Sequence, residues 1–133
     1  MALLIDTDLL IDLERGHGAS EAELALGEEE RAISVITVSE LLHGVLRAEG
    51  AVRVRRRAFV EHLLAGLQAI PITEPVARVH AEVWADLSDR GAAIGAHDLW
   101  IAATALAHGL GLATRNTSDF GRVAGLRVVA GAP

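Results

Sequence analysis

The 133-residue sequence contains neither cysteine nor lysine, and its twelve basic side chains are all arginine. The lack of cysteine excludes thiol nucleophiles, thiolate metal sites and disulfides, and it is compatible with a reducing compartment, so we expect a cytoplasmic protein. The lack of lysine excludes Schiff-base enzymes, Walker-type ATPases and every other mechanism that depends on a lysine.

Aromatic residues and long apolar runs are also scarce. The chain has two tryptophans, two phenylalanines and no tyrosine, so its core must be built from Leu, Val, Ile and Ala, which suit a sheet covered by helices. No apolar run approaches the roughly 18 residues of a membrane span. The N-terminus reaches Asp6 without a basic region before it, so we expect no signal peptide and no membrane contact.

The net charge of −6 argues against the basic surface of a protein that coats nucleic acid. Acidic side chains outnumber basic ones by 18 to 12. Any contact with nucleic acid must therefore be local or mediated by a metal.

Strand-like and helix-like patterns alternate along the chain. Apolar runs predict five strands, at residues 2–5, 32–36, 69–72, 112–114 and 126–129. Apolar residues at helical spacing predict helices around residues 41–46, 59–67, 76–87 and 99–106. This alternation predicts an α/β fold with three layers, α/β/α, and a central, mostly parallel five-stranded sheet, in one domain of residues 1–133. Residues 16–20 are interpreted as a turn and residues 90–95 as a flexible connection.

Four acidic residues fall where predicted strands end and helices begin. Asp6 follows the first strand, and Glu40 lies just past the second, in the first turn of its helix. Asp98 opens the helix before the fourth strand, and Asp119 follows that strand. Because ligands of open α/β sheets bind outside the carboxyl ends of the strands, we expect the four carboxylates to converge at one edge.

Some of these carboxylates also have a local explanation, because acidic side chains stabilise helix N-termini. Residues 37–40 match a capping box, in which Glu40 would satisfy a backbone N–H. A cap formed by Asn116 or Thr117 could explain Asp119. Taken singly, Glu40 and Asp119 are better explained in this way. Helix caps, however, have no need to meet at one point, and clustered carboxylates repel one another.

Divalent cations would join the four carboxylates into one site. Four carboxylates carry a charge of −4, which two Mg²⁺ ions balance, and hard oxygen ligands suit Mg²⁺ or Mn²⁺ better than zinc. Two such cations can stabilise the attacking and leaving oxygens of an in-line phosphoryl displacement. We expect Asp6, which could also be only a helix cap, and Asp98 to be the core metal ligands. Glu40 would orient the water or a second metal, and Asp119 would complete the site.

Four segments of the sequence form a recognisable series. They are residues 4–11 (LIDTDLLI), 37–44 (TVSELLHG), 97–105 (HDLWIAATA) and 114–120 (TRNTSDF). In this order, they resemble the successive motifs of PIN-domain ribonucleases, most closely the VapC-type toxins of type II toxin–antitoxin systems. The resemblance covers essentially the whole chain.

The resemblance implies an endoribonuclease that hydrolyses RNA, with the four carboxylates as its metal-binding set and Mg²⁺, or else Mn²⁺, as cofactor. It also implies a cognate VapB-like antitoxin as partner, and a homodimer. Supporting polar groups would be Thr7, Thr114 and Asn116. Asp8 stands where the family commonly has Asn; it adds a fifth carboxylate or caps the following helix, and we favour the cap.

Two surfaces have more than one interpretation. The arginine-rich segment 53–57 could hold substrate phosphates or form a solvated helix face paired with nearby acids, and Arg115, beside the expected site, is the better candidate for a phosphate contact. An apolar helix face could serve the antitoxin or the second protomer, although part of it is expected to be core. Its residues are Leu41, Leu42, Val45 and Leu46.

Two alternative functions remain open. The sequence Asp6-Thr7-Asp8 after an apolar strand matches the nucleophile motif of haloacid-dehalogenase-type phosphatases, but those enzymes normally use a lysine, which this chain lacks. A catalytically silent PIN-like scaffold that only binds a partner predicts dispensable acids. A di-iron site is excluded because it needs Glu-x-x-His on two facing helices, and within the predicted helices the pattern occurs once, at residues 40–43.

Overall fold

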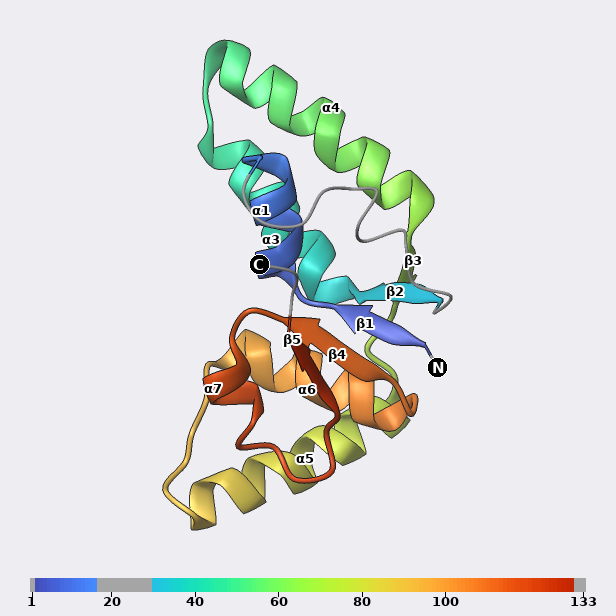
Figure 1. Cartoon of the computed structure of the whole chain (residues 1–133), viewed down its shortest axis with the longest axis vertical. Helices are drawn as coiled ribbons and strands as arrows, with labels where there is room; N and C mark the ends of the chain where they lie inside the picture. The colour runs from blue at the N-terminus through green and yellow to red at the C-terminus, as the bar shows by residue number, and fades with distance from the viewer. Residues whose placement is uncertain (1, 17–29, 131–133) are drawn as a thin grey trace.

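Five short strands form a parallel sheet in the computed structural model, which describes residues 2–16 and 30–130 (Figure 1). The strand order is β3-β2-β1-β4-β5, and every pair of neighbours is parallel. The strands are β1 (Leu3–Ile5), β2 (Arg31–Ser34), β3 (Gln68–Ile70), β4 (Gly111–Thr114) and β5 (Val128–Ala130). The predicted five-stranded α/β fold is thereby confirmed.

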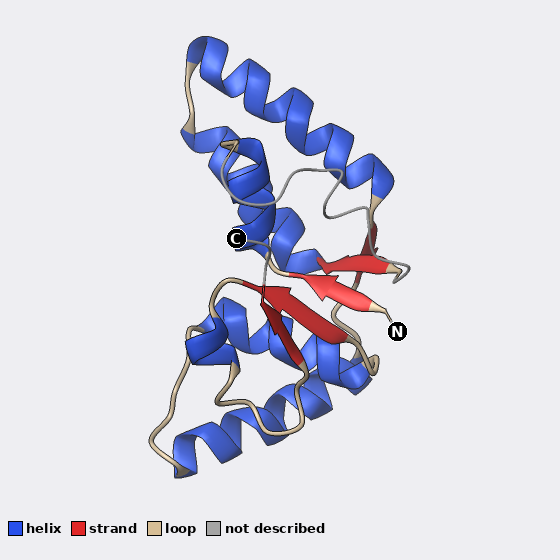
Figure 2. Ribbon diagram, viewed as in Figure 1, coloured by secondary structure: helices blue, strands red, loops and turns tan. Residues whose placement is uncertain are grey.

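Helices cover both faces of the sheet (Figure 2). One face carries α1, α3 and α4, and the other carries α5 and α6. The predicted helices lie within α3 to α6, except that α4 ends one residue before Leu67. The bounds are α1 (Thr7–Glu14), α3 (Val35–Arg47), α4 (Gly50–Gly66), α5 (Glu74–Asp89), α6 (Ala96–Ala107) and α7 (Thr117–Phe120).

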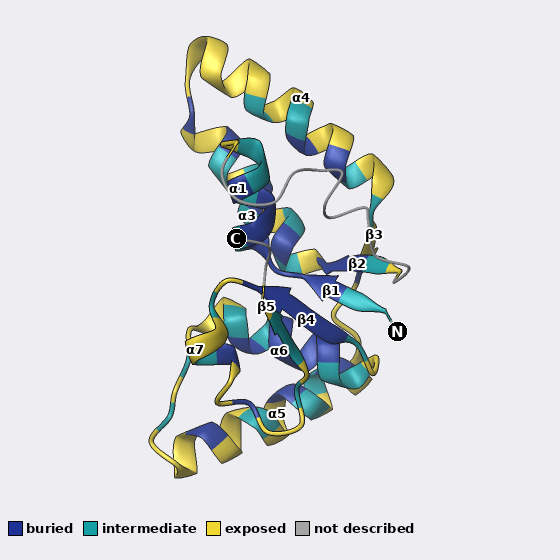
Figure 3. Ribbon diagram, in the orientation of Figure 1, coloured by how far each residue is buried: buried dark blue, intermediate teal, exposed yellow. Residues whose placement is uncertain are grey.

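Neighbouring residues of β1 contribute to different cores, because successive strand side chains point to opposite faces. Leu4 packs in a cluster with Leu87 of α5 and Ile101 of α6. Ile5 packs in the opposite cluster with Leu41 of α3. Figure 3 shows the two buried layers on either side of β1 and β4, and the exposed outer surface of α4. The chain therefore builds both cores from aliphatic side chains, as its composition predicts.

The second strand is shorter than predicted, because Ser34 ends β2 and caps α3. Its hydroxyl accepts a hydrogen bond from the backbone N–H of Ile36 at 3.0 Å. A serine cap favours helix initiation and outweighs the β propensity of the apolar residues that follow. Thr37 is consequently a buried residue inside α3. The predicted capping box at residues 37–40 is wrong, and Glu40 lies in the second turn of α3 and not in the first.

The two connections predicted from the sequence can be compared with the structure. The turn predicted at residues 16–20 begins at Gly16, whose φ of 72° is a left-handed conformation that favours glycine; residues 17–20 lie outside the described part. The connection at residues 90–95 joins α5 to α6, with Gly91 at φ 62°. No helix within the described residues combines the length and apolar character needed to cross a membrane.

The direction of strand addition reverses between β1 and β4. From β1 the chain adds β2 and then β3 on one side, whereas β4 and β5 lie on the other side. The two central strands are in register from Leu3 with Gly111 to Ile5 with Ala113. Reversal points of this kind leave a crevice at the carboxyl ends of the strands, where α/β proteins bind ligands. Asp6 and Thr114 occupy those ends.

Candidate active site

Asp6 links the ends of β1 and β4. Its Oδ1 accepts a hydrogen bond from the backbone N–H of Thr7 at 2.8 Å, so Asp6 caps α1, and its Oδ2 accepts one from the Thr114 hydroxyl at 2.6 Å. Burial raises the pKa of Asp6 to about 7; the bond from Thr114 opposes this shift, and the charges of Asp8 and Asp98 add to it. A cap alone does not require burial beside other carboxylates, so the capping explanation is incomplete.

Asp98 lies in the first turn of α6 and is partly buried. Burial raises its pKa, and the charges of Glu40, Asp119 and Asp8 raise it further, whereas neighbouring His97 lowers it. Such effects require short separations, because charge interactions weaken with distance. The structure thus brings together carboxylates from the ends of β1 and β4 and from helices α3 and α6. We call Asp6, Asp8, Glu40, Asp98 and Asp119 the acidic edge.

Glu40 points across the site towards two other helices. The Thr7 hydroxyl donates a hydrogen bond to Glu40 Oε1 at 2.8 Å and lies 2.9 Å from the Thr37 hydroxyl. The other carboxylate oxygen of Glu40 lies 3.5 Å from Nδ1 of His97, which precedes Asp98. Once the capping box is excluded, these contacts are what orient Glu40. Thr7 therefore contacts both Glu40 and Thr37, and its supporting role stays a prediction.

Asp119 lies in the single turn of α7, which Asn116 caps. The side chain of Asn116 accepts a hydrogen bond from the backbone N–H of Asp119 at 3.3 Å and donates one to its carboxylate at 3.1 Å. Of the two predicted caps, Asn116 is therefore correct and Thr117 is not. Arg122 Nη1 lies 3.6 Å from the other carboxylate oxygen, so Asp119 has both a cation and an amide as partners.

The organisation of the chain matches a known domain: the family model described as "PIN domain" aligns with residues 3–126. This chain belongs to the PIN-domain family. It is 37% identical over 130 residues to Ribonuclease VapC1 of Rickettsia felis, an alignment that covers 97% of this chain and 96% of that protein. The tRNA(fMet)-specific endonuclease VapC of Shigella flexneri is 28% identical over 128 residues, with 96% of each covered.

Solved structures agree with this assignment. The PIN domain superimposes on a chain of the VapBC2 complex of Rickettsia felis bound to a promoter DNA fragment, with a TM-score of 0.88, 26% identity and 98% of both chains covered. VapBC-5 of Mycobacterium tuberculosis gives a TM-score of 0.77 at 27% identity, with 100% of both chains covered. The resemblance to VapC-type PIN domains is confirmed.

Asp8 does not have its predicted role as the cap of α1 in this PIN domain. Asp6 is the cap of α1, so the interpretation of Asp8 as the cap is wrong: it lies inside the first turn. Its Oδ2 accepts a hydrogen bond from the backbone N–H of Arg115 at 3.1 Å and lies 3.3 Å from the Thr114 hydroxyl. Its Oδ1 is buried and has no hydrogen-bond partner among the described residues.

Asp12 is a residue of the site region that the sequence analysis missed. Its carboxylate, largely buried, lies 2.6 Å from Nε of Arg115. The guanidinium predicted to contact phosphate is therefore held by α1 in this structure. The sequence could have indicated Asp12, because it follows Asp8 by four residues and so lies on the same face of the helix.

Three arginines of segment 53–57 bind backbone carbonyls and acidic side chains of α1, α3 and α4 or their flanks. Arg53 donates hydrogen bonds to the carbonyls of Ala48 and Leu46, at 2.6 and 2.8 Å. Arg56 pairs with Glu14 of α1 at 3.3 Å, and Arg57 with Glu61 of its own helix at 3.9 Å. These contacts favour the interpretation as a solvated face paired with nearby acids.

The donor set of the acidic edge fits a hard divalent cation. All its side-chain donors are carboxylate oxygens, and a buried oxygen of Asp8 lacks a partner. Within the described ranges, no three histidine, aspartate or glutamate side chains form a preassembled metal site. Asp6 and Asp98, with Glu40 and Asp119 beside them, would hold such an ion.

Proposed function

We propose that this PIN domain is a Mg²⁺- or Mn²⁺-dependent endoribonuclease that acts as the toxin of a toxin–antitoxin pair. The observation that carries the proposal is the buried Asp6, whose pKa is raised to about 7 beside the carboxylates of Asp8 and Asp98. Burial of a carboxylate beside two others destabilises the folded state, and a bound divalent cation would neutralise this charge. The names of the relatives, Ribonuclease VapC1 and tRNA(fMet)-specific endonuclease VapC, support RNA as the substrate.

The residues of the site would divide the work of hydrolysis. A divalent cation, when bound, lowers the pKa of the attacking water and stabilises the charge that develops on the scissile phosphate. Asp6 and Asp98 hold the cation. Thr114 orients Asp6, and Thr7 orients Glu40, which in turn positions the attacking water. Asn116 directs the carboxylate of Asp119.

The decisive experiment measures cleavage of total RNA by purified protein freed of any antitoxin, with Mg²⁺ or Mn²⁺ and with EDTA. Wild-type protein should cleave only with metal, and Asp98→Asn should not cleave. Asp89→Asn removes the same charge at an exposed position of α5 and should behave as wild type. Equal cleavage by Asp98→Asn would identify a contaminating nuclease. Absence of cleavage from all variants, with metal demonstrably bound, would favour the partner-binding scaffold.

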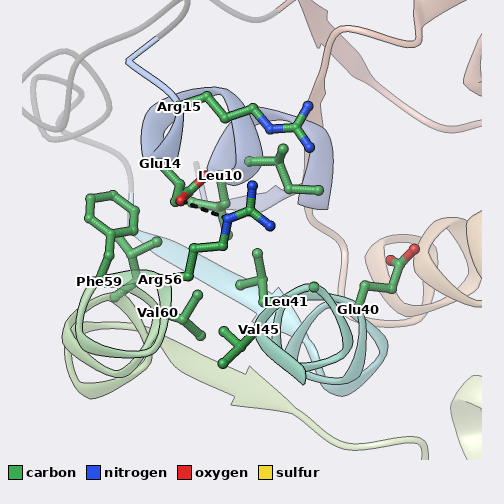
Figure 4. A pocket seen from close by; sticks show the side chains of 12 residues that line it. Leu10, Glu14, Arg15, Glu40, Leu41, Val45, Arg56, Phe59 and Val60 are labelled. Atoms are coloured by element: carbon green, nitrogen blue, oxygen red, sulfur yellow. Dashed lines mark ion pairs between the residues drawn. The ribbon is translucent and has the colours of Figure 1, made fainter. Parts of the chain in front are cut away.

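The antitoxin would bind in an apolar groove between α1, α3 and α4 (Figure 4). Leu10 of α1, Leu41 of α3 and Val60 of α4 line its floor, and the Arg56–Glu14 pair lies across it. A groove of this composition suits the apolar face of an amphipathic segment. The similarity to VapBC2 of Rickettsia felis and to VapBC-5 of Mycobacterium tuberculosis, a member of the VapBC family of toxin–antitoxin systems, supports a VapB-like partner.

Part of the helix face predicted to serve a partner is core. Leu41 and Val45 are buried, whereas Leu46 is 55% exposed.

Growth arrest on expression, relieved by a small DNA-binding protein encoded directly upstream and absent for Asp6→Ala, would test the toxin function in cells. The homodimer stays a prediction. Sedimentation equilibrium of the purified protein would test it.

A further inference from the structure

We propose that Asp8 is a fifth carboxylate ligand of the cation site, with Oδ1 as the coordinating atom. This inference rests on the proposed function, because it adds a ligand to the same site.

The two oxygens of the Asp8 carboxylate have different surroundings. Oδ2 is held by the backbone N–H of Arg115 at 3.1 Å and lies close to the Thr114 hydroxyl. Oδ1 is buried, and no donor among the described residues reaches it. A buried carboxylate oxygen without a donor is unfavourable unless a cation or a proton satisfies it. Asp8 is therefore fixed through one oxygen, and its other oxygen is buried without a partner among the described residues.

Contacts from β4 and α1 fix the position of Asp8 relative to Asp6. The Thr114 hydroxyl lies 2.6 Å from Asp6 Oδ2 and 3.3 Å from Asp8 Oδ2, between the two carboxylates. Arg115, whose N–H contacts Asp8, is itself held by Asp12 at 2.6 Å. The chain thus holds two acidic groups beside one hydroxyl, where they repel each other.

The distribution of cationic partners separates the acidic edge into two sets. Glu40 lies 3.5 Å from His97, and Asp119 lies 3.6 Å from Arg122. Within residues 2–16 and 30–130, the remaining carboxylates of the edge have no ion pair. These are Asp6, Asp8 and Asp98. The charge left for a cation to neutralise is therefore concentrated on three residues, and Asp8 is one of them.

The test uses Mn²⁺ and Tb³⁺, two cations that accept oxygen ligands, with the full-length chain. Titration calorimetry gives the affinity for Mn²⁺, and Tb³⁺ luminescence lifetimes in H₂O and D₂O give the number of water molecules on the bound ion. Asp8→Ala removes both oxygens and should weaken Mn²⁺ binding by about 10- to 100-fold. Loss of one ligand should also add about one water to bound Tb³⁺. Asp89→Asn, the control for lost charge, should change neither value.

Asp8→Asn is the second variant, since it keeps an oxygen that can accept from the Arg115 N–H. We expect weaker Mn²⁺ binding, by about 10-fold, and about one more water on Tb³⁺, because the amide nitrogen that takes the place of Oδ1 cannot coordinate a cation. An unchanged hydration number for Asp8→Ala would overturn the proposal, even if affinity fell through lost charge alone. If thermal unfolding shows that Asp8→Ala is not folded, unchanged Mn²⁺ affinity of Asp8→Asn would overturn it instead.

The outcomes also separate this inference from the proposed function. If wild-type protein binds Mn²⁺ and cleaves RNA, and the Asp8 variants keep wild-type affinity and hydration, only the role of Asp8 is refuted. If wild-type protein binds no Mn²⁺ while Asp98→Asn and wild type unfold alike, the metal-dependent function and the ligand role of Asp8 are refuted together.

Discussion

The acidic edge and the apolar groove are adjacent regions that meet at Glu40, which belongs to both. In the groove, the Arg56–Glu14 pair already neutralises the charges beside the apolar floor. At the edge, Asp6, Asp8 and Asp98 form no ion pair within the described part of the chain. One region therefore suits a protein segment, whereas the other suits a cation. The predictions below ask whether the two regions can be perturbed separately.

The largest effect is expected from Asp98→Asn, which removes a carboxylate from the unpaired set. RNA cleavage should fall by about 10³-fold or more, because both the cation site and its charge balance are lost. Secondary structure by circular dichroism should be unchanged. Loss of activity of similar size in the groove variant described below would remove the distinction between the two regions.

The metal-free protein should become less stable as pH rises from about 4 to about 7. Asp6 has an ordinary pKa of 3.8 that the fold raises to about 7, so the native state keeps a proton that the unfolded chain releases over this range. Stability then falls with pH, by up to about 4 kcal/mol if the full shift applies. Denaturant unfolding in EDTA at pH 5 and pH 8 measures this loss.

Asp6→Asn provides the comparison for the pH dependence. Its unfolding free energy should depend less on pH, and at pH 8 in EDTA it should exceed that of wild type. Saturating Mg²⁺ should stabilise wild type at pH 8, because a ligand bound only to the native state adds to the free energy of unfolding. Wild-type stability that rises with pH across this range would contradict the burial of a repelled Asp6.

A smaller effect is expected from Thr7→Val, which removes the hydroxyl that donates to Glu40 and leaves the shape similar. Cleavage should fall by about 10-fold, since a misoriented carboxylate positions water poorly. Thr104→Val is the matched control: its hydroxyl is also buried and donates to a helix carbonyl, that of Trp100 at 2.8 Å. Both variants should lose about 1 kcal/mol of stability, and only Thr7→Val should lose activity.

The smallest effect is expected from Arg56→Ala in the groove. The Arg56–Glu14 pair is partly exposed, at 33% and 19% of the side-chain surfaces, so its loss should cost about 0.5 kcal/mol and leave metal-dependent cleavage within about twofold of wild type. Arg57→Ala, next to it but paired only with Glu61 on the surface, should not alter cleavage. A tenfold loss of cleavage in either variant would revive the alternative that this segment binds substrate phosphates.

The elements of the fold could be predicted because each leaves a local pattern. Apolar runs marked all five strands, and helical spacing marked α3 to α6. The end of β2 was misplaced because two residues after Ser34 are β-branched and suit either state, and a single hydroxyl contact decides between them. That error also produced the false capping box and with it an explanation of Glu40 that the structure does not support.

The contacts that hold the candidate site depend on strand register, which no local pattern reveals. Pairing of Ile5 with Ala113 brings Thr114 to Asp6 and Arg115 to Asp8. The convergence of acids was predictable from topology, because the carboxyl ends of parallel strands share one edge. The unpartnered oxygen of Asp8 was not predictable, since it depends on which donors reach each of the two carboxylate oxygens.

The hydrogen bond between Asp6 and Thr114 joins residues 108 positions apart, and this separation bears on the timing of synthesis. A ribosome makes Asp6 among the first residues and Thr114 only after most of the chain. Until β4 leaves the exit tunnel, β1 lacks one of its two neighbours and Asp6 lacks the hydroxyl that orients it. The nascent polypeptide therefore cannot assemble the acidic edge while the ribosome still holds β4.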